Sequence, residues 1–573
     1  MRILLLVHGF NSLSQRLYVE LQRDGHELSV EFDIHDDVTR EAVELFRPDL
    51  VLAPFLKRAI PASVWQRLPC LIVHPGPPGD RGPAALDWAI LRGADRWGVT
   101  VLQAEAAMDA GPVWASEEFT MRTARKSSLY RNEVTEAAVS AVRRAIARLN
   151  AGERPAAPGA GAHGWQPPLA QPRRAIDWQR DDTATVLRKL HAADGFPGVE
   201  DLLLERRFRL FDGHREERLA GRPGTLIARR HGAICRATRD GAVWIGQLQP
   251  VEDGQRGFKR PAAIALGPLA QDLPVSEDDP AAPRNDASLR EIRYEERGSI
   301  GYLHFDFYNG AMSTAQCNRL RTAYAQARRR PTRIIVLMGG EDFWSNGMHL
   351  HCIEAAESPA DASWDNINAI DDLAQDILTT DTHLTIAALQ GNAAAGGVFL
   401  ALAADLVLAR SGVVLNPHYR NMGNLYGSEY WTYLLPRRTG GERAQTLMAG
   451  RLPIGAPEAQ ALGLIDAHAG PDAAAFQTLV ASRAAALAAN ENCAQALADK
   501  RARRARDEYA RPLADYRAAE LERMRLNFYG FDPSYHVARH RFVHRAPQAW
   551  TPLYLARHRQ LGNASRDATT ACA

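Results

Sequence analysis

Residues 70–82 read CLIVHPGPPGDRG. A short apolar run that ends in His74 and enters a loop of Pro and Gly is typical of a buried strand that stops at the rim of a sheet. Similar apolar runs occur at 3–7, 50–53 and 99–102, and amphipathic stretches lie between them at 14–23 and 84–92. This alternation predicts an α/β domain with a parallel sheet, and it places His74 where such sheets bind ligands.

The pattern changes several times along the 573 residues, which is long enough for three or four domains. Short strands separated by glycine-containing turns follow the first domain, then the α/β pattern returns, and the end of the chain is helical in composition. The predicted organisation is an α/β domain at 1–150, a linker at 151–174, a small β-barrel domain at 175–270, a linker at 271–290, a second α/β domain at 291–475 and a helical extension at 476–573.

The composition is that of a globular protein, with 46% hydrophobic and 24% charged residues. No apolar run approaches the ~18 residues that a membrane span needs, so no membrane partner is expected. The six cysteines are scattered without a C-x-x-C pair, which argues against a disulfide framework and predicts a cytoplasmic protein.

The formal net charge of +2 conceals a basic end. Residues 500–573 contain 15 Lys and Arg against 7 Asp and Glu, a net charge of +8. A nucleic acid, an acidic membrane surface and a phosphorylated small molecule are all candidate partners. Aromatic residues are not interleaved with the basic ones as a stacking platform requires, so no nucleic-acid partner is expected.

His74 on its own is more often a core histidine than a catalytic one. Asp109, one strand later, could orient the imidazole for acid–base chemistry. The spacing of H-P, R-G, W-A-I, G-V-T and M-D-x-G over residues 74–111 resembles the N10-formyltetrahydrofolate-dependent formyltransferases. The resemblance implies that His74 and Asp109 are catalytic, and that the small domain is the barrel of the methionyl-tRNA enzyme, with IDW at 176–178 and FPG at 196–198.

One position departs from that family, because Ile72 stands where it has an Asn that binds the oxyanion. Loss of such a donor costs about 2.7–4 kcal/mol in related acyl transfer. A thiol acceptor, which is a better nucleophile than a weakly basic amine, needs less of this help.

A second pair of segments reads FWSNGMHL at 343–350 and GNAAAGGVFLALAAD at 391–405. Glycines at such sites let backbone donors converge on developing negative charge. Both segments resemble the enoyl-CoA hydratase (crotonase) superfamily, which implies that the N–H groups of Met348 and Gly396 hold the thioester oxygen of a coenzyme A ester. The hydratase glutamates fall on Phe399 and His418, so hydration of a double bond is not expected.

Tyr419 and Glu429 lie in the polar segment NPHYRNMGNLYGSEYW at 416–431. A Glu desolvated among aromatic residues would have a raised pKa and could transfer protons near neutral pH. Packing or surface exposure explains the same two residues equally well from the sequence alone.

The two modules, in this order and with both catalytic sets altered, resemble one family of [NiFe]-hydrogenase maturation factors. The resemblance implies formyl transfer from N10-formyltetrahydrofolate to coenzyme A, then decarbonylation of formyl-CoA to carbon monoxide and CoA by Tyr419 and Glu429. It also makes other maturation proteins expected partners. Two alternatives stay open: a formyltransferase for an amine acceptor fused to an unrelated acyl-CoA enzyme, and a non-catalytic CoA- or folate-binding scaffold.

Residues expected to bind the two cofactors are Asn11, Ser12, Gln15, Pro75, Gly76, Arg81, Gly82, Gly397, Arg131, Arg541 and Arg545. Arg131 falls in the first turn of a helix predicted from Ser128 to Leu149, where the dipole disfavours a cation unless an anion is near. Arg539, Arg541 and Arg545 would bind CoA phosphates, with a solvated basic face as the alternative.

His536, His540 and His544 lie four residues apart on one face of a predicted helix. Three imidazoles in one line cannot all converge on one ion, and no carboxylate or Cys pair accompanies them along the sequence. No metal site is therefore expected.

Overall fold

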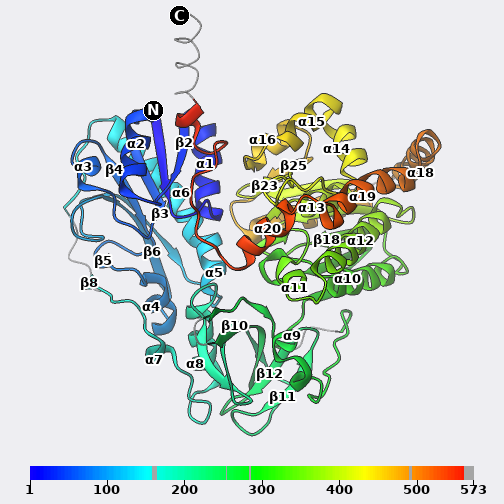
Figure 1. Ribbon diagram of the computed structural model, residues 1–573. Coiled ribbons are helices and arrows are strands. Elements are labelled where there is room, and N and C mark those ends of the chain that lie inside the picture. The colour runs from blue at the N-terminus through cyan, green and yellow to red at the C-terminus, as the bar shows by residue number, and fades with distance from the viewer. Residues whose placement is uncertain (158–163, 253–254, 283–285, 490–492, 561–573) are drawn as a thin grey trace, which may run out of the picture. The chain divides into compact units, whose positions relative to one another are not determined.

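The computed structural model describes residues 1–157, 164–252, 255–282, 286–489 and 493–560 (Figure 1). It divides into two compact units. The first contains residues 1–202, 209–213 and the chain from 547 onward, and the second contains residues 203–208 and 214–546. Residues 158–163 and 283–285 of the two predicted linkers, together with Cys572, lie outside the described residues.

The first unit contains a six-stranded sheet of order β2-β1-β3-β4-β6-β7. Its strands are β1 (Arg2–Val7), β2 (Glu27–Phe32), β3 (Leu50–Phe55), β4 (Cys70–His74), β6 (Arg96–Gln103) and β7 (Val113–Thr120). The first four pair in parallel, as the alternation of strands and helices predicts, whereas β6 pairs antiparallel with β4 and β7 pairs antiparallel with β6. β1, β3 and β4 lie inside the sheet, which explains their nearly continuous apolar sequence.

Helices cover this sheet, and polar side chains begin several of them. Asn11 accepts a hydrogen bond from the N–H of Ser14 and so begins the first helix. The helices are α1 (Ser12–Arg23), α2 (Asp36–Phe46), α3 (Ala62–Trp65), α4 (Ala85–Arg92), α5 (Lys126–Leu129), a π-helical turn (Tyr130–Val134), α6 (Thr135–Asn150), α7 (Gln171–Arg174) and α8 (Thr183–Ala193). The predicted linker at 151–174 also contains β8 (Gly164–Trp165), which pairs with β5 (Asp80–Arg81).

The segment from 547 to 560 completes the first unit at its edge strand, β2. The N–H of Val30 donates to the carbonyl oxygen of Leu555 at 3.0 Å, and the N–H of Phe32 donates to Oγ1 of Thr551 at 2.8 Å. Nε2 of His558 lies 3.0 Å from Oε2 of Glu31, and neither residue is exposed. Burial would raise the pKa of Glu31, but hydrogen bonds from His558, Thr551 and Arg559 outweigh it and leave the pKa low.

A small β domain follows, with strand order β11-β12-β13-β10-β9, and two short strands pair with β13. Its elements are β9 (Val199–Leu203), β10 (Arg206–Glu216), β11 (Leu226–Arg230), β12 (Ala233–Ala237), β13 (Ala242–Glu252), β14 (Gln255–Arg256), β15 (Arg260–Pro261), α9 (Ala262–Leu266) and a 3-10 turn (Gly267–Ala270). These strands lie within residues 175–270, for which the sequence predicts a small domain of strands.

The second unit contains two further sheets, of order β16-β17-β18-β20-β22-β25 and β19-β21-β23-β24. The first consists of β16 (Ile292–Arg297), β17 (Ile300–Phe305), β18 (Ile334–Met338), β20 (Leu384–Leu389), β22 (Leu406–Arg410) and β25 (Ala467–Ala469). The second consists of β19 (Phe343–Ser345), β21 (Asn392–Ala394), β23 (Val414–Asn416) and β24 (Ile454–Gly455). Parallel pairing of β19, β21 and β23 brings the loops after these strands to one edge.

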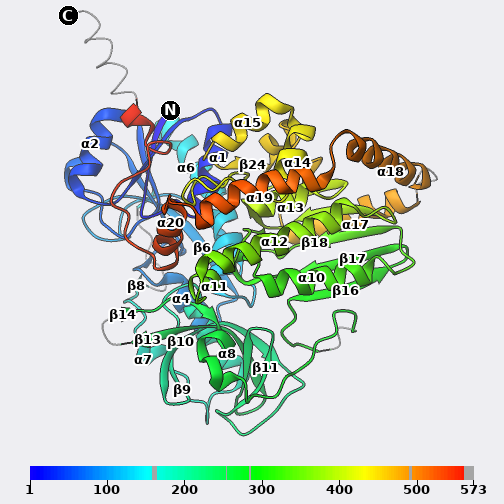
Figure 2. The same ribbon diagram turned by 45° about the vertical axis from the view of Figure 1, so that its right-hand side comes forward.

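Helices pack on these sheets around a large apolar core. They are a 3-10 turn (Tyr308–Gly310), α10 (Thr314–Ala327), α11 (Leu350–Glu354), α12 (Pro359–Leu378), α13 (Gly396–Leu402), α14 (Trp431–Thr439), α15 (Gly441–Ala449) and α16 (Ala456–Ala461). The predicted helical extension is α17 (Ala473–Ala489), α18 (Cys493–Ala510), α19 (Leu513–Tyr529) and α20 (Ser534–Val543). α19 packs against α12 and α14, and α20 packs against α11 (Figure 2).

None of the described helices is both long and apolar enough to cross a bilayer. The five described cysteines are free thiols.

Candidate functional site

His74 is the last residue of β4 and lies between two carboxylates. Its Nε2 is 2.9 Å from Oδ1 of Asp80, and its Nδ1 is 3.5 Å from Oδ2 of Asp109. Only 4% of the His74 side chain is exposed, and Asp80 is buried. The second oxygen of Asp80 is buried without a hydrogen-bond partner in the structure as described. Asp80 therefore orients the imidazole through Nε2, and Asp109 lies beside Nδ1.

The loop around this imidazole depends on its glycines. A Cβ atom on Gly76 would lie 2.5 Å from Nε2 of His74 and 2.6 Å from Oδ1 of Asp80. Gly82, at φ +116°, donates its N–H to Asp109 at 3.0 Å. The carbonyl oxygen of Pro75 accepts a hydrogen bond from Trp97, and Arg81 donates to the carbonyl oxygen of Met108 at 3.3 Å. These predicted binding residues thus shape the site of His74.

The sequence interpretation did not include Asp80. The sequence shows Asp80 only as an acidic residue six positions after the histidine, in a loop whose path the sequence does not define. Ile72 lies on β4 beside Ala53 and Leu102, so an apolar side chain occupies the position of the family's amide.

The other predicted residues of the first module gather at the N-terminal end of α1. Asn11 begins this helix, Ser12 is its first residue, and Gln15 donates to the carbonyl oxygen of Phe10 at 2.9 Å. Tyr130, half-buried beside Asn11, has its pKa raised to about 12 by desolvation, although a hydrogen bond to Asn11 opposes the shift. Arg131 follows it.

The prediction that Arg131 occupies a first helical turn is wrong. The helix begins at Lys126, and Arg131 lies in the π-helical turn that continues it. The dipole argument for a nearby anion therefore does not apply, and Arg131 is instead a half-buried cation one position after Tyr130.

In the second unit, the two glycine-containing segments converge. The turn after β19 carries Met348, and Gly396 is the first residue of α13, after Ala395 at φ +48°. A Cβ on Gly347 would lie 3.5 Å from the nitrogen of Gly396. The first N–H groups of a helix have no partner within that helix. The Asn366 side chain accepts the N–H of His349 and donates to the carbonyl oxygen of Met312, which fixes the turn at Met348.

Gly397 serves close packing. A Cβ atom there would fall 2.1 Å from the carbonyl oxygen of Ser345, so only glycine allows α13 to lie against β19. This contact accounts for Gly397 without a ligand.

The carboxylate of Glu429 lies at the N-terminus of α13. A Cβ on Gly396 would meet its Oε1 at 1.9 Å. The hydroxyl of Tyr419 donates to Oε2 of Glu429 at 2.5 Å, and both residues are buried. Burial, with Asp371 nearby, raises the pKa of Glu429 well above its ordinary value. Burial and the charge of Glu429 raise the pKa of Tyr419. The pair is placed to hold a proton beside the two converging segments.

Two further buried carboxylates, absent from the sequence interpretation, support Glu429. Asp371 on α12 accepts the N–H of Glu429 at 2.8 Å, and Glu520 on α19 accepts the N–H of Tyr430 at 2.9 Å. Glu429 and Tyr430 both have φ +60°, so the loop needs this support. Burial raises the pKa of Asp371 to about 6 and that of Glu520 to about 8.

The positions of the hydratase glutamates are occupied differently. Phe399 is buried and stacks on the ring of Tyr419, with ring centroids 5.6 Å apart. His418 is 6% exposed, and neither ring nitrogen has a hydrogen-bond partner in the part of the chain that the structure describes. Burial lowers the pKa of His418 to about 4, so its imidazole is neutral.

Two predictions about the basic extension need correction. Arg539 is 5% exposed and forms an ion pair with Glu354 at 2.7 Å, so it does not face solvent as a phosphate ligand. Glu354 also contacts His540 and His544, so a carboxylate does accompany these imidazoles, although the sequence places it far away. Arg541 and Arg545 are exposed.

The fold and both sites define a two-module protein, a formyl transferase followed by an enoyl-CoA hydratase-like domain. Family models match at 31–146 (formyl transferase), 169–255 (formyl transferase, C-terminal domain) and 295–551 (enoyl-CoA hydratase/isomerase). The chain is 55% identical to the hydrogenase maturation factor HoxX of Bradyrhizobium diazoefficiens, over 98% of this chain and 97% of that protein. It belongs to the HoxX/HypX family of hydrogenase maturation factors.

Two further likenesses agree with this assignment. The crystal structure of HypX from Aquifex aeolicus in complex with tetrahydrofolic acid is 50% identical, with a TM-score of 0.95, and covers 98% of this chain and 99% of that one. The methionyl-tRNA formyltransferase of Dichelobacter nodosus is 28% identical over 215 residues, which are 35% of this chain and 66% of that enzyme. The predicted family and fold class are confirmed.

Proposed function

We propose that this protein makes carbon monoxide for the active-site iron of [NiFe]-hydrogenase. In the first reaction, the thiol of coenzyme A attacks the formyl carbon of N10-formyltetrahydrofolate, which gives formyl-CoA and tetrahydrofolate. In the second, formyl-CoA breaks into carbon monoxide and CoA. The proposal makes the chain a formyltransferase coupled to a decarbonylase of the lyase type.

The surroundings of His74 support the first reaction. Asp80 and Asp109 lie beside its two nitrogens and would stabilise the imidazolium that forms when His74 takes the thiol proton, before that proton passes to the leaving nitrogen. Ile72 removes the donor that transfer to an amine relies on, and a thiolate is the more nucleophilic acceptor. Tetrahydrofolate in the Aquifex aeolicus relative supports a folate donor.

The observation that carries the proposal is the buried pair of Tyr419 and Glu429 against Gly396. Hydratases need two glutamates for their acid–base chemistry, and Phe399 and His418 occupy those positions. The feature that the chain shares with the hydratases is the convergence of Met348 and Gly396, whose N–H groups would hold the formyl oxygen of a CoA thioester.

Decarbonylation breaks two bonds of the formyl carbon. The C–H electron pair becomes the lone pair of carbon monoxide, and the C–S pair leaves on sulfur, which takes a proton to become the CoA thiol. Glu429, whose pKa is raised by burial and by the nearby Asp371, gives a proton to sulfur and accepts the formyl proton. It therefore ends each cycle in its starting state, with Tyr419 holding the carboxyl in place.

Arginine side chains supply the proposed contacts to CoA. Arg541 and Arg545 are exposed, and the half-buried Arg131 is a third candidate, whereas Arg539 is buried in its ion pair with Glu354. We place the reaction in the cytoplasm, and we expect other hydrogenase maturation proteins to receive the product.

Mixing the purified protein with CoA and N10-formyltetrahydrofolate labelled with ¹³C in the formyl group tests the proposal. We expect labelled carbon monoxide, trapped by reduced haemoglobin and identified by its absorption and mass. Formyl-CoA supplied directly tests the second reaction alone.

Each other outcome identifies what is wrong. Formyl-CoA that accumulates without carbon monoxide contradicts the decarbonylase assignment. Formylation of an added amine without formyl-CoA favours the amine-acceptor enzyme, and binding of folate and CoA without turnover favours the scaffold.

A further inference from the structure

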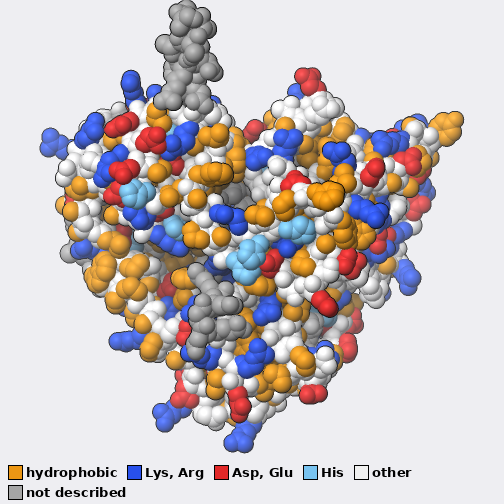
Figure 3. Space-filling view, viewed as in Figure 1, with side chains coloured by type: hydrophobic (Ala, Val, Ile, Leu, Met, Phe, Trp, Pro, Cys, Tyr) orange, Lys and Arg blue, Asp and Glu red, His pale blue; other side chains and the backbone are white. Residues whose placement is uncertain are grey.

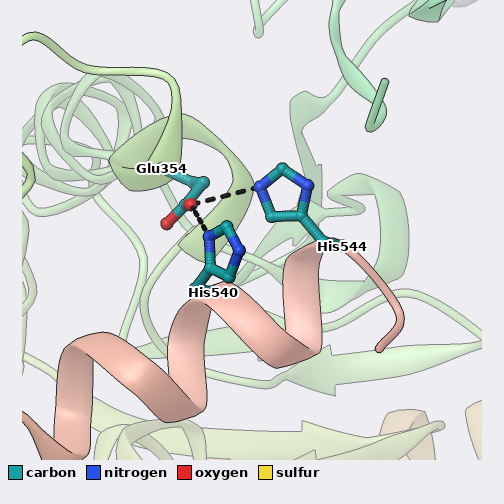
Figure 4. Close-up of side chains that lie close together, drawn as sticks. All are labelled: Glu354, His540 and His544. Carbon is teal, nitrogen blue, oxygen red and sulfur yellow. Dashed lines mark hydrogen bonds and ion pairs between the residues drawn. The ribbon is translucent and has the colours of Figure 1, made fainter. Parts of the chain in front are cut away.

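Three side chains of metal-binding types, one Glu and two His, lie close together in the second unit. Glu354 is the last residue of α11, His540 lies on α20, and His544 follows its end (Figure 4). Oε1 of Glu354 is 2.8 Å from Nδ1 of His540 and 3.2 Å from Nε2 of His544. One oxygen and two nitrogens thus lie within 4.8 Å of one another.

The local fold produces this convergence. Residues four apart on a helix lie on the same face, so His540 and His544 project together, with ring centroids 4.1 Å apart. α20 packs against α11, which brings Glu354 to that face. The edge of the His544 ring meets Phe258 at 5.0 Å between centroids, which limits its rotation.

A supporting layer of hydrogen bonds holds the carboxylate. Arg539 donates Nε to Oε2 of Glu354 at 2.7 Å, on the side away from the imidazoles. Arg539 in turn contacts Nδ1 of His536 at 2.8 Å, and Nε2 of His536 lies 2.9 Å from the carbonyl oxygen of Phe528. Such supporting partners are typical of metal ligands.

The donor spacing also fits an ion. Ligand atoms about 2.0–2.2 Å from a tetrahedral metal are about 3.3–3.6 Å apart, and the observed separations of 2.8 and 3.2 Å need only a small expansion. Without an ion, both imidazoles compete for one oxygen of Glu354. The side chain of His540 is 60% exposed, so water can fill the remaining position. Figure 3 shows histidine side chains reaching the surface beside an acidic one.

We propose that Glu354, His540 and His544 bind a divalent first-row transition metal ion of the Zn²⁺ type. Two imidazoles with one carboxylate suit such ions, whereas Mg²⁺ and Ca²⁺ prefer oxygen ligands throughout. The ion joins α20 to α11. Because α11 begins two residues after Met348, the ion also fastens the C-terminal helices to the segment that carries Met348.

Metal titration of the full-length protein, after treatment with a chelator and buffer exchange, tests this site. Zn²⁺ is titrated in competition with a chromophoric chelator, and Co²⁺ is added separately because its visible absorption reports coordination. We expect one equivalent bound, visible Co²⁺ bands, a Zn²⁺-dependent rise in Tm, and none of these effects with Mg²⁺.

Variants connect binding to the three residues. We expect His540→Ala, His544→Ala and Glu354→Gln each to weaken Zn²⁺ binding by about tenfold or more. His468→Ala, in the same unit but outside the cluster, should bind like the wild type. Melting curves without metal show that each variant is folded. Absence of Zn²⁺ binding by the wild type would overturn the proposal. His540→Ala and His544→Ala variants that bind Zn²⁺ as tightly as the wild type would overturn it as well.

Discussion

Glu520 accepts a hydrogen bond from the N–H of Tyr430 at 2.9 Å, although 90 residues separate them along the chain. The same carboxylate accepts the N–H and the hydroxyl of Thr432. A helix of the C-terminal extension therefore holds the loop on which Glu429 lies. The extension is part of the second site rather than only a basic surface.

Replacement of Glu520 by Gln should change how stability depends on pH. Burial raises the pKa of Glu520 from 4.5 to about 8, so between these values the folded protein keeps a proton that the unfolded chain loses. This contribution is present at low pH and is lost as pH rises through about 8. Gln does not titrate. We expect the free energy of unfolding of the wild type, minus that of the variant, to decrease between pH 5 and pH 8.5.

Chemical denaturation at a series of pH values measures this difference. Carboxylates far from Glu520 titrate equally in both proteins and cancel in the subtraction, whereas Asp371 and Glu429 interact with its charge. A difference that stays constant over the range would show that Glu520 is ionised throughout in the folded protein.

Glu429→Gln should abolish release of carbon monoxide from formyl-CoA while leaving formyl transfer intact. Gln fills the same volume beside Gly396 but can neither accept nor give the proton. Acid–base catalysis contributes about 10²–10⁴-fold to rates, and a loss of this size is expected in kcat. Haemoglobin trapping of carbon monoxide measures it, with formyl-CoA formation as the internal control. Unchanged release would remove Glu429 from the mechanism.

Gly396→Ala should impair the same step for a geometric reason. The added methyl group would lie 1.9 Å from Oε1 of Glu429, so the carboxylate or the start of α13 must move. Loss of one donor to an oxyanion lowers kcat about 10²–10³-fold, and we expect an effect of that order.

Gly441→Ala is a matched control, because Gly441 is also the first residue of a helix and a Cβ there meets nothing within 4 Å. We expect this variant to release carbon monoxide like the wild type. Equal activity of the two variants would contradict the role given to Gly396.

Asp80→Asn should slow formyl transfer without affecting decarbonylation of added formyl-CoA. The carboxylate orients His74 through Nε2, and loss of an orienting carboxylate in a catalytic triad costs about 10⁴-fold. Because Asp109 still contacts the other nitrogen, we expect a smaller loss, about 10–100-fold in kcat. Steady-state kinetics with N10-formyltetrahydrofolate and CoA measure it, and the exposed Asp95→Asn serves as control. Equal rates in both variants would make Asp80 structural.

Local patterns predicted much of the fold. The strand that ends at His74 and the helix that begins at Gly396 are marked by apolar runs next to Pro and Gly, and these signals lie within a few residues of the features they define. The helical extension also followed from composition. The antiparallel pairing of β6 with β4 and of β7 with β6 could not be predicted in this way, because strand direction depends on how the chain returns to the sheet.

Local sequence patterns did not predict several residues of the two sites. Asp80 meets His74 through the path of one loop, whereas Asp371 and Glu520 reach the Glu429 loop only because α12 and α19 pack beside it. Glu354 lies almost two hundred residues from His540 in sequence, so the helix pattern showed the imidazoles without their carboxylate. Contacts of this kind are set by tertiary packing, which residue spacing does not contain.

The segment at 547–560 has a consequence for how the protein is made. It covers the edge of β2 and pairs with Glu31, so this strand is completed by residues that are translated much later, such as Thr551, which contacts Phe32 across 519 residues of chain. Until then β2 presents unpaired backbone groups, a surface prone to pairing with other chains. Nascent chains that stall within the second unit should therefore depend on chaperones that shield strand edges.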